Sequence, residues 1–238
     1  MGKLLELSEK KAKFEIINKS SSTAEILLYG GVGEDVWDES SVSAKQFSDA
    51  LKDLPKGVSQ IDLRINSPGG SVFDGVSIYE RLKSHRAKVT AYVDGISASI
   101  ATIIMMAADE IVISEGGMVM IHKPMAGVYG NTTEMEQMVN LLDKIESQMT
   151  SIYSKRTGMS RIEIAKMLDS GDTWFTAEEA VEAGLVDSIN GESNLKIAAS
   201  MVDKASWIVA KPVINTINAK KVKSVLSKRL EEMRNYKK

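Results

Sequence analysis

The sequence contains no cysteine, so neither disulfide bonds nor thiolate-bound metals contribute to its structure. This absence is compatible with a reducing compartment. The longest apolar run, Ile96 to Ala108, is too short to cross a bilayer and includes serine and threonine. The N-terminus lacks the apolar core of a secretory signal, and Glu6 does not fit a myristoylation motif. We therefore expect a cytoplasmic protein with no membrane partner.

Strong charge and ligand-binding motifs are also missing. Lysine and arginine number 30 against 32 aspartates and glutamates, and a net charge of −2 says little about partners. The sequence has no cluster of metal ligands and no glycine fingerprint for phosphate, so we expect no metal and no other cofactor. Residues 211–238 are the basic exception, and apolar residues between Val222 and Met233 predict an amphipathic helix that docks on a partner. We do not expect that partner to be nucleic acid.

What remains is an ordinary globular composition, 43% apolar and 26% charged over 238 residues, which suits one large domain with appendages. We expect a peripheral segment over 1–23, the domain over 24–190 and a basic extension over 191–238. Strands and helices alternate, which predicts an α/β fold with parallel strands. Strands are predicted at 24–30, 60–66, 87–93, 110–114, 117–121 and 185–189, with short ones within 169–176 and at 126–130. Helices are predicted at 44–51, 74–82, 100–108, 131–155, 160–168 and 177–184.

A serine stands where one of these strands runs into a buried helix. The segment Asp94–Ile100 follows the strand 87–93 and places Ser99 next to the start of an apolar helix. Free N–H groups and the helix dipole favour negative charge at such a point, which suits a nucleophile whose attack creates an oxyanion. The alternative is a small-residue turn that packs a helix on a sheet.

A glycine-rich loop follows the preceding strand. In Ser67-Pro68-Gly69-Gly70-Ser71, two adjacent glycines allow a tight turn that exposes backbone N–H groups. Because this loop and Ser99 end neighbouring strands, together they would supply a nucleophile and two oxyanion donors. Taken alone, the loop is also compatible with a plain strand-to-helix turn.

Only two histidines are available as a general base. His122 directly follows an apolar strand, whereas His85 lies at a polar helix end where a solvated role is expected. His122 is therefore the better-placed base, although a histidine after a strand also serves as a capping residue. Asp172 could orient such a histidine, or it could be a turn residue after Gly171.

Four motifs in order resemble the proteolytic subunit of the Clp protease: Ile65–Gly70, Asp94–Ser99, Met120–Pro124 and Thr176–Asp187. The resemblance covers roughly residues 24–190. It implies a ClpP/crotonase-like fold of repeated β-β-α units with a protruding handle helix, about residues 126–155, followed here by a helical tail. It also implies serine endopeptidase activity. The lead-in Val93-Asp94-Gly95 and the N-terminal segment look closer to the phage head maturation (prohead) proteases.

The resemblance also implies roles for individual residues. The family's nucleophile falls on Ser99, its histidine on His122 and its aspartate on Asp172, with the N–H groups of Gly70 and Ile100 as oxyanion donors. A polypeptide substrate and a hexameric or heptameric ring of identical subunits, single or paired, are further implications. The expected substrate-binding residues are Gly69, Ser71, Val72, Phe73, Met125, Ala126, Gly127 and Val128.

Two departures from the family pattern leave the partners open. Gly171 stands where the family often has an arginine used in ring-to-ring pairing, and the first two dozen residues do not resemble the family's axial loops. These features favour ATP-independent processing of capsid protein, with a partnership with an ATPase unfoldase as the alternative. Two other classes are a crotonase-like acyl-CoA enzyme and a non-catalytic scaffold. The pair Ser99 and His122 argues against the first, and the intact triad positions argue against the second.

Overall fold

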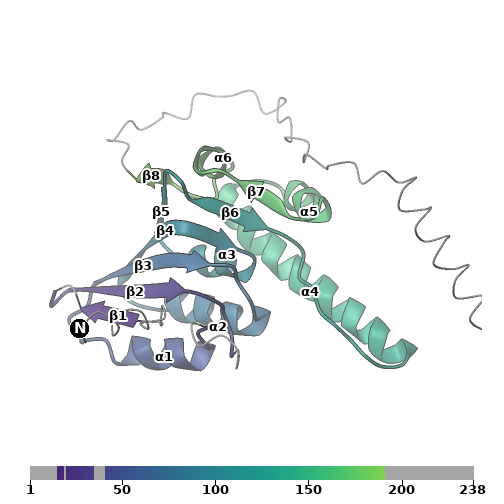
Figure 1. The fold of residues 1–238 in the computed structure, drawn as a ribbon, viewed down its shortest axis with the longest axis horizontal. Coiled ribbons are helices and arrows are strands. Elements are labelled where there is room, and N and C mark those ends of the chain that lie inside the picture. Colours follow the sequence, from purple (N-terminus) through teal and green to yellow (C-terminus); the bar gives the residue numbers. More distant parts are fainter. Residues whose placement is uncertain (1–14, 19, 35–40, 191–238) are drawn as a thin grey trace, which may run out of the picture. The chain divides into compact units, whose positions relative to one another are not determined.

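A mostly parallel sheet forms the centre of the computed structural model, which describes residues 15–18, 20–34 and 41–190 (Figure 1). Within these residues eight strands join one sheet, and six of them follow the order β1-β2-β3-β4-β5-β8. All neighbours on this path are parallel except β1 and β2. The strands are β1 (Glu15–Asn18), β2 (Thr23–Tyr29), β3 (Gln60–Ser67), β4 (Lys88–Ala98), β5 (Glu110–Ser114) and β8 (Ser188–Asn190).

The long strand β4 divides the sheet. Its first half, residues 90–93, pairs with β5, and its second half, residues 96–98, pairs with β6 (Met118–Ile121). The antiparallel strand β7 (Thr173–Phe175) extends the sheet beyond β6. Since β4 also pairs with β3, the residue after β4 lies between the ends of β3 and β6. That residue is Ser99.

Three helices pack against one face of the sheet: α1 (Ala44–Lys52), α2 (Val72–Lys83) and α3 (Ile100–Met105) (Figure 1). The residues of β2 and β3 alternate between buried and partly exposed, as a half-covered sheet requires. All six residues of α3 are buried, which confirms the prediction of a buried helix after Ser99. Two short helices, α5 (Arg161–Asp169) and α6 (Ala177–Glu182), flank β7 in sequence and begin at capping boxes.

The longest helix, α4 (Thr132–Thr157), changes character along its length. Its N-terminal half is largely exposed and runs beyond the sheet, whereas Ile145, Met149, Thr150 and Tyr153 in the second half are buried (Figure 1). The apolar stripe predicted for this helix therefore contributes to the core only near its C-terminal end. No helix among the described residues is both long and apolar enough to span a membrane.

The structure confirms the predicted α/β class with parallel strands, and it corrects several elements. Residues 126–130 form no strand, because this exposed segment pairs with none of the described strands. Glu15–Asn18, inside the segment predicted to be peripheral, forms β1 at the sheet edge. Helix α2 begins at Val72 rather than Asp74, because Ser71 caps it. The predictions for residues 1–14 and for the helical tail within 191–238 lie outside the described residues.

Candidate active site

Ser99 has an unusual backbone conformation. It occupies the N-cap position of α3 with φ 54° and ψ −129°, and it is the only non-glycine residue with positive φ in the described part of the chain. Holding a non-glycine residue in this sparsely populated φ/ψ region costs about 1–3 kcal/mol, and the conformation persists only where the surrounding structure holds it. One such contact is the Ser99 N–H, which donates to the Met120 carbonyl oxygen at 2.9 Å. The strand β6 thus helps to hold the strained serine in place.

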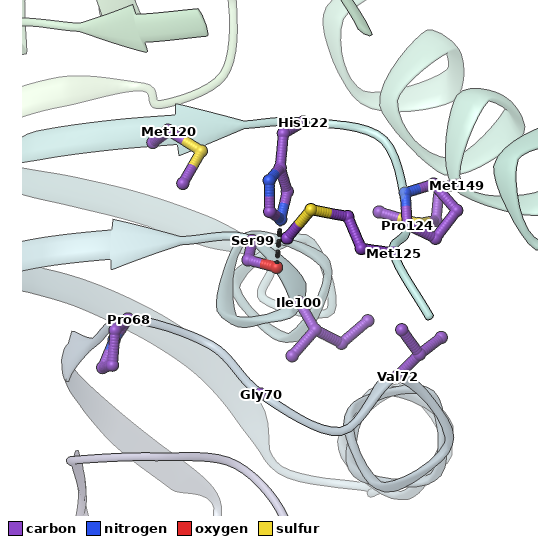
Figure 2. A pocket seen from close by; sticks show the side chains of 10 residues that line it. All are labelled: Pro68, Gly70, Val72, Ser99, Ile100, Met120, His122, Pro124, Met125 and Met149. Carbon is purple, nitrogen blue, oxygen red and sulfur yellow. Dashed lines mark hydrogen bonds between the residues drawn. The ribbon is translucent and has the colours of Figure 1, made fainter. Parts of the chain in front are cut away.

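The three side chains predicted to act together do meet in the structure. His122 Nε2 lies 2.7 Å from Ser99 Oγ, and Figure 2 shows the imidazole pointing at the hydroxyl. On the other side of the ring, Nδ1 lies 3.3 Å from Asp172 Oδ1. His122 follows β6 and Asp172 precedes β7, so the antiparallel pairing of these strands brings the two residues together. The His122 side chain is only 14% exposed, whereas that of Asp172 is 62% exposed.

The glycine-rich loop reaches the same place from β3. Gly69 and Gly70 have φ values of 93° and 147°, a region that favours glycine. Val32 holds the loop, because its N–H donates to the Gly69 carbonyl at 2.9 Å and its own carbonyl accepts from the Ser71 N–H at 2.7 Å. A Cβ at Gly70 would stand 2.1 Å from the Val32 oxygen, so no other residue fits there unchanged.

A cavity of about 250 Å³ opens beside Ser99 and His122 (Figure 2). Its wall is mainly apolar and includes three methionines. Two of these, Met120 and Met125, flank His122 in the sequence, and the third, Met149, comes from α4. The full lining is Pro68, Gly70, Val72, Ser99, Ile100, Met120, His122, Pro124, Met125 and Met149.

The predicted oxyanion donors and substrate residues are placed unevenly around this cavity. Gly70, Ile100, Val72 and Met125 line it. Ser71 caps α2, with its hydroxyl donating to Asp74 at 2.7 Å, so its polar groups are used within the loop.

Five further predicted residues are not part of the cavity wall. Gly69 lies against Ser99. Phe73 is 67% exposed, and Ala126, Gly127 and Val128 form part of an exposed segment. Their contact with substrate stays a prediction.

Lys123 links the segment after β6 to two helices. Its ammonium lies 2.5 Å from Asp169 on α5 and 3.3 Å from Glu146 on α4. The bond to Asp169 raises the pKa of Lys123, so the ammonium stays charged. Because Lys123 follows His122 and Asp169 precedes Asp172 by three residues, this contact joins the two chain segments that carry the histidine and the aspartate.

Two other chemistries find no support near the cavity. Ser97 is fully buried, and its hydroxyl has no hydrogen-bond partner among the described residues, so it is not placed to attack a substrate. No group of histidine, aspartate and glutamate side chains in the described ranges is arranged to hold a metal ion. Sequence reasoning missed Met149 as a wall residue, because its helical spacing indicated only a core stripe or a subunit interface.

Comparison with known proteins gives this arrangement a family. A family model described as Clp protease matches residues 8–193. The chain belongs to the Clp protease family. It is 32% identical over 157 residues to the ATP-dependent Clp protease proteolytic subunit 1 of Chlamydia abortus. This match covers 62% of this chain and 81% of the Chlamydia protein. An asparagine-to-aspartate mutant of ClpP1 from Listeria monocytogenes has a similar structure, with a TM-score of 0.60 and 27% identity. That match covers 69% of this chain and 90% of the Listeria chain.

Proposed function

We propose that this member of the Clp protease family is a serine endopeptidase whose triad is Ser99, His122 and Asp172. The observation that carries the proposal is the 2.7 Å contact between Ser99 Oγ and His122 Nε2, two residues in the wall of a mainly apolar cavity. A hydroxyl at this distance from an imidazole nitrogen is the arrangement that nucleophilic catalysis by serine requires. Membership of the family supplies an independent reason to expect a peptidase.

The proposed reaction begins with His122 Nε2 accepting the hydroxyl proton while Ser99 Oγ attacks the scissile carbonyl carbon. For this step the neutral ring carries its proton on Nδ1, the nitrogen that faces Asp172. The imidazolium then gives the proton to the leaving amine, and water repeats the cycle on the acyl-enzyme. The Gly70 and Ile100 N–H groups would bind the oxyanion, and loss of one such donor typically lowers kcat by about 10²–10³-fold.

The surroundings of the cavity favour an extended polypeptide as substrate. Exposed apolar side chains adjoin two lining residues in the sequence: Phe73 follows Val72, and Val128 and Tyr129 lie in the segment after Met125, with exposures of 40% or more. The segment that carries Met125 and Val128 lacks a strand partner in the described chain, so its backbone is available to pair with a substrate strand. Main-chain pairing of this kind gives low sequence specificity, with the cavity selecting an apolar side chain.

Two physiological settings fit this chemistry. The phage-like lead-in Val93-Asp94-Gly95 and the N-terminal segment favour maturation of capsid protein without ATP. Gly171, in place of the family's arginine, leaves the pairing of two rings open. The name of the Chlamydia relative, an ATP-dependent proteolytic subunit, favours the second setting, a general proteolytic subunit that works with an ATPase. In both settings we expect a ring of identical subunits. Cleavage of an unfolded protein by the purified chain, without ATP or a partner, supports the first setting.

The catalytic proposal is tested by comparing hydrolysis of a fluorogenic peptide by wild type, Ser99→Ala and Ser97→Ala. We expect Ser99→Ala to lose at least about 10³-fold in kcat/KM. Ser97→Ala is the matched control, because it deletes a hydroxyl two residues away that is buried and unpartnered within the described chain. Retained hydrolysis in Ser99→Ala, or its loss only in Ser97→Ala, would refute the assignment. If wild type itself cleaves nothing in any assembled form, the scaffold alternative is favoured.

A further inference from the structure

A buried hydrogen-bond chain connects α4 to the carbonyl oxygen of Ser99. Thr102 Oγ1 lies 2.6 Å from this oxygen and 2.5 Å from the hydroxyl of Tyr153. Both Thr102 and Tyr153 are fully buried. The carbonyl only accepts, so Thr102 donates its single hydroxyl proton there, and Tyr153 must donate to Thr102. Burial raises the pKa of Tyr153 above its usual value, which keeps this phenol protonated.

The Ser99 carbonyl is held twice by the same residue. The Thr102 N–H also donates to it, at 3.0 Å. These contacts fix ψ of Ser99 at a residue whose backbone conformation is already strained. A strained residue keeps its conformation only when neighbouring contacts outweigh the cost, and the chain from Tyr153 supplies such contacts from a separate helix.

The same contacts determine where the next N–H points. Ser99 C=O and Ile100 N–H belong to one planar trans peptide, so fixing the direction of the oxygen fixes the opposite direction of the N–H. Ile100 is the first residue of α3, and its N–H is one of those that a helix leaves without an intrahelical partner. Ile100 also lines the cavity beside Ser99 and His122.

We propose that Thr102 and Tyr153 are positioning residues that aim the Ile100 N–H at the oxyanion, by holding the Ser99–Ile100 peptide from its carbonyl side. This inference rests on the proposed peptidase function. Neither residue touches the substrate in this account. Their effect is on the transition state, where the oxyanion forms, more than on binding of the uncleaved peptide.

The buried C-terminal half of α4 contributes both to the cavity wall and to the hydrogen-bond chain. Tyr153 and the cavity residue Met149 are one helical turn apart and are both buried, so one face of α4 serves the cavity and the peptide anchor together. Figure 2 shows Met149 at the edge of the cavity. A displacement of α4 would therefore change the cavity wall and loosen the oxyanion donor at the same time.

Tyr153→Phe isolates the proposed effect, because it removes only the hydroxyl and leaves Thr102 bonded to the Ser99 carbonyl. We expect kcat for a fluorogenic peptide to fall about 5–30-fold with KM changed less than about twofold, a partial loss compared with complete removal of a donor. A peptide boronate forms a tetrahedral adduct with the serine. Its affinity for Tyr153→Phe should be lower than for wild type by a factor similar to the fall in kcat. Thr102→Val should lose more, and Thr102→Ser should restore activity because it keeps the hydroxyl.

Ser154→Ala is the matched control on the same helix. It removes a 2.6 Å bond to the Met159 carbonyl, which stabilises α4 without reaching Ser99, so kcat should stay within about twofold of wild type. The double variant Tyr153→Phe/Thr102→Val should be no worse than Thr102→Val alone, since both act through one chain of bonds.

Tyr153→Phe with wild-type kcat and boronate affinity would overturn the inference while leaving the peptidase assignment intact. A kcat loss equal to that of Ser154→Ala would also overturn it, because it would reflect a general weakening of α4. If wild type neither cleaves peptides nor binds the boronate, the proposed function itself has failed.

Discussion

Gly69 lies directly against Ser99. A Cβ at Gly69 would stand 2.7 Å from Ser99 Cβ and 2.7 Å from the Ala98 carbonyl oxygen. The loop after β3 and the strained serine after β4 are therefore in contact, with no space for a side chain between them. Gly70, which follows Gly69, and Ser99 line the same cavity, so loss of this contact should affect activity and stability together.

The first prediction follows from that contact. We expect Gly69→Ala to lower the free energy of unfolding by about 1–3 kcal/mol, through a strained φ and a clash with backbone, and to remove most peptidase activity. Denaturant unfolding and peptide hydrolysis measure the two effects. Gly116→Ala is the control, because a Cβ there meets nothing within 4 Å. Wild-type activity in Gly69→Ala would contradict the close fit between the loop and the serine.

The second prediction concerns Asp172, which is 62% exposed and lies 3.3 Å from His122. Water screens an exposed carboxylate, so it should stabilise the imidazolium less than a buried one would. We expect Asp172→Asn to lower kcat about 10–100-fold, less than the loss in Ser99→Ala. The control is Asp143→Asn, which makes the same change from carboxylate to amide at an exposed position on α4. A loss in Asp172→Asn as large as that in Ser99→Ala would show that the aspartate is buried in the active assembly.

A third prediction uses the exposed half of α4. Met135 and Val139 are one turn apart and are 48% and 57% exposed, an apolar pair that the described residues leave largely uncovered. If these residues contact a second copy in the proposed ring, Val139→Asp should shift the complex toward smaller species in native mass spectrometry. Gln137→Asp, which adds the same charge to another exposed position on α4, should not. An unchanged mass in Val139→Asp would place the subunit interface elsewhere.

A fourth prediction concerns stability and pH. Burial, with Arg86 and Arg81 nearby, lowers the pKa of His85, and its Nδ1 accepts a hydrogen bond from the Ala87 N–H at 3.1 Å. The unfolded chain binds the proton more readily, so this histidine favours folding above its usual pKa of about 6.5 and loses that effect as the pH falls. The fall in unfolding free energy from pH 7 to 5 should be shallower in His85→Asn, whose amide oxygen also accepts from Ala87. An identical slope in wild type and His85→Asn would contradict this account.

Much of the fold follows from local patterns in the sequence. The alternation in Gln60–Asn66 identifies β3, because a strand buried on one face alternates apolar and polar residues. The apolar run after Ser99 identifies α3, because a helix buried on all sides is largely apolar. The sequence does not indicate β1, since four residues carry too little pattern to predict a strand. It predicts a strand at 126–130 that does not form, because a strand depends on a neighbouring strand that the sequence does not reveal.

The sequence predicts the site residues that belong to a recognisable motif, but not those whose position depends on how the helices pack. Ser99 and His122 stand in motifs of recognisable spacing, and they meet at 2.7 Å. Met149 and Tyr153 lie more than twenty residues from any of these motifs, so their helical spacing indicated only a buried or interface stripe. Their contribution to the site depends on where α4 packs, which is a property of the tertiary structure.

The most direct test of the central claim is to label the wild-type protein with a fluorophosphonate and locate the modified residue by peptide mass spectrometry. This reagent forms a covalent bond with a serine that a neighbouring histidine activates. The account predicts stoichiometric labelling of Ser99, abolished by His122→Ala and unaffected by Ser97→Ala. Labelling of a different serine, or no labelling in any oligomeric form of the protein, would contradict it.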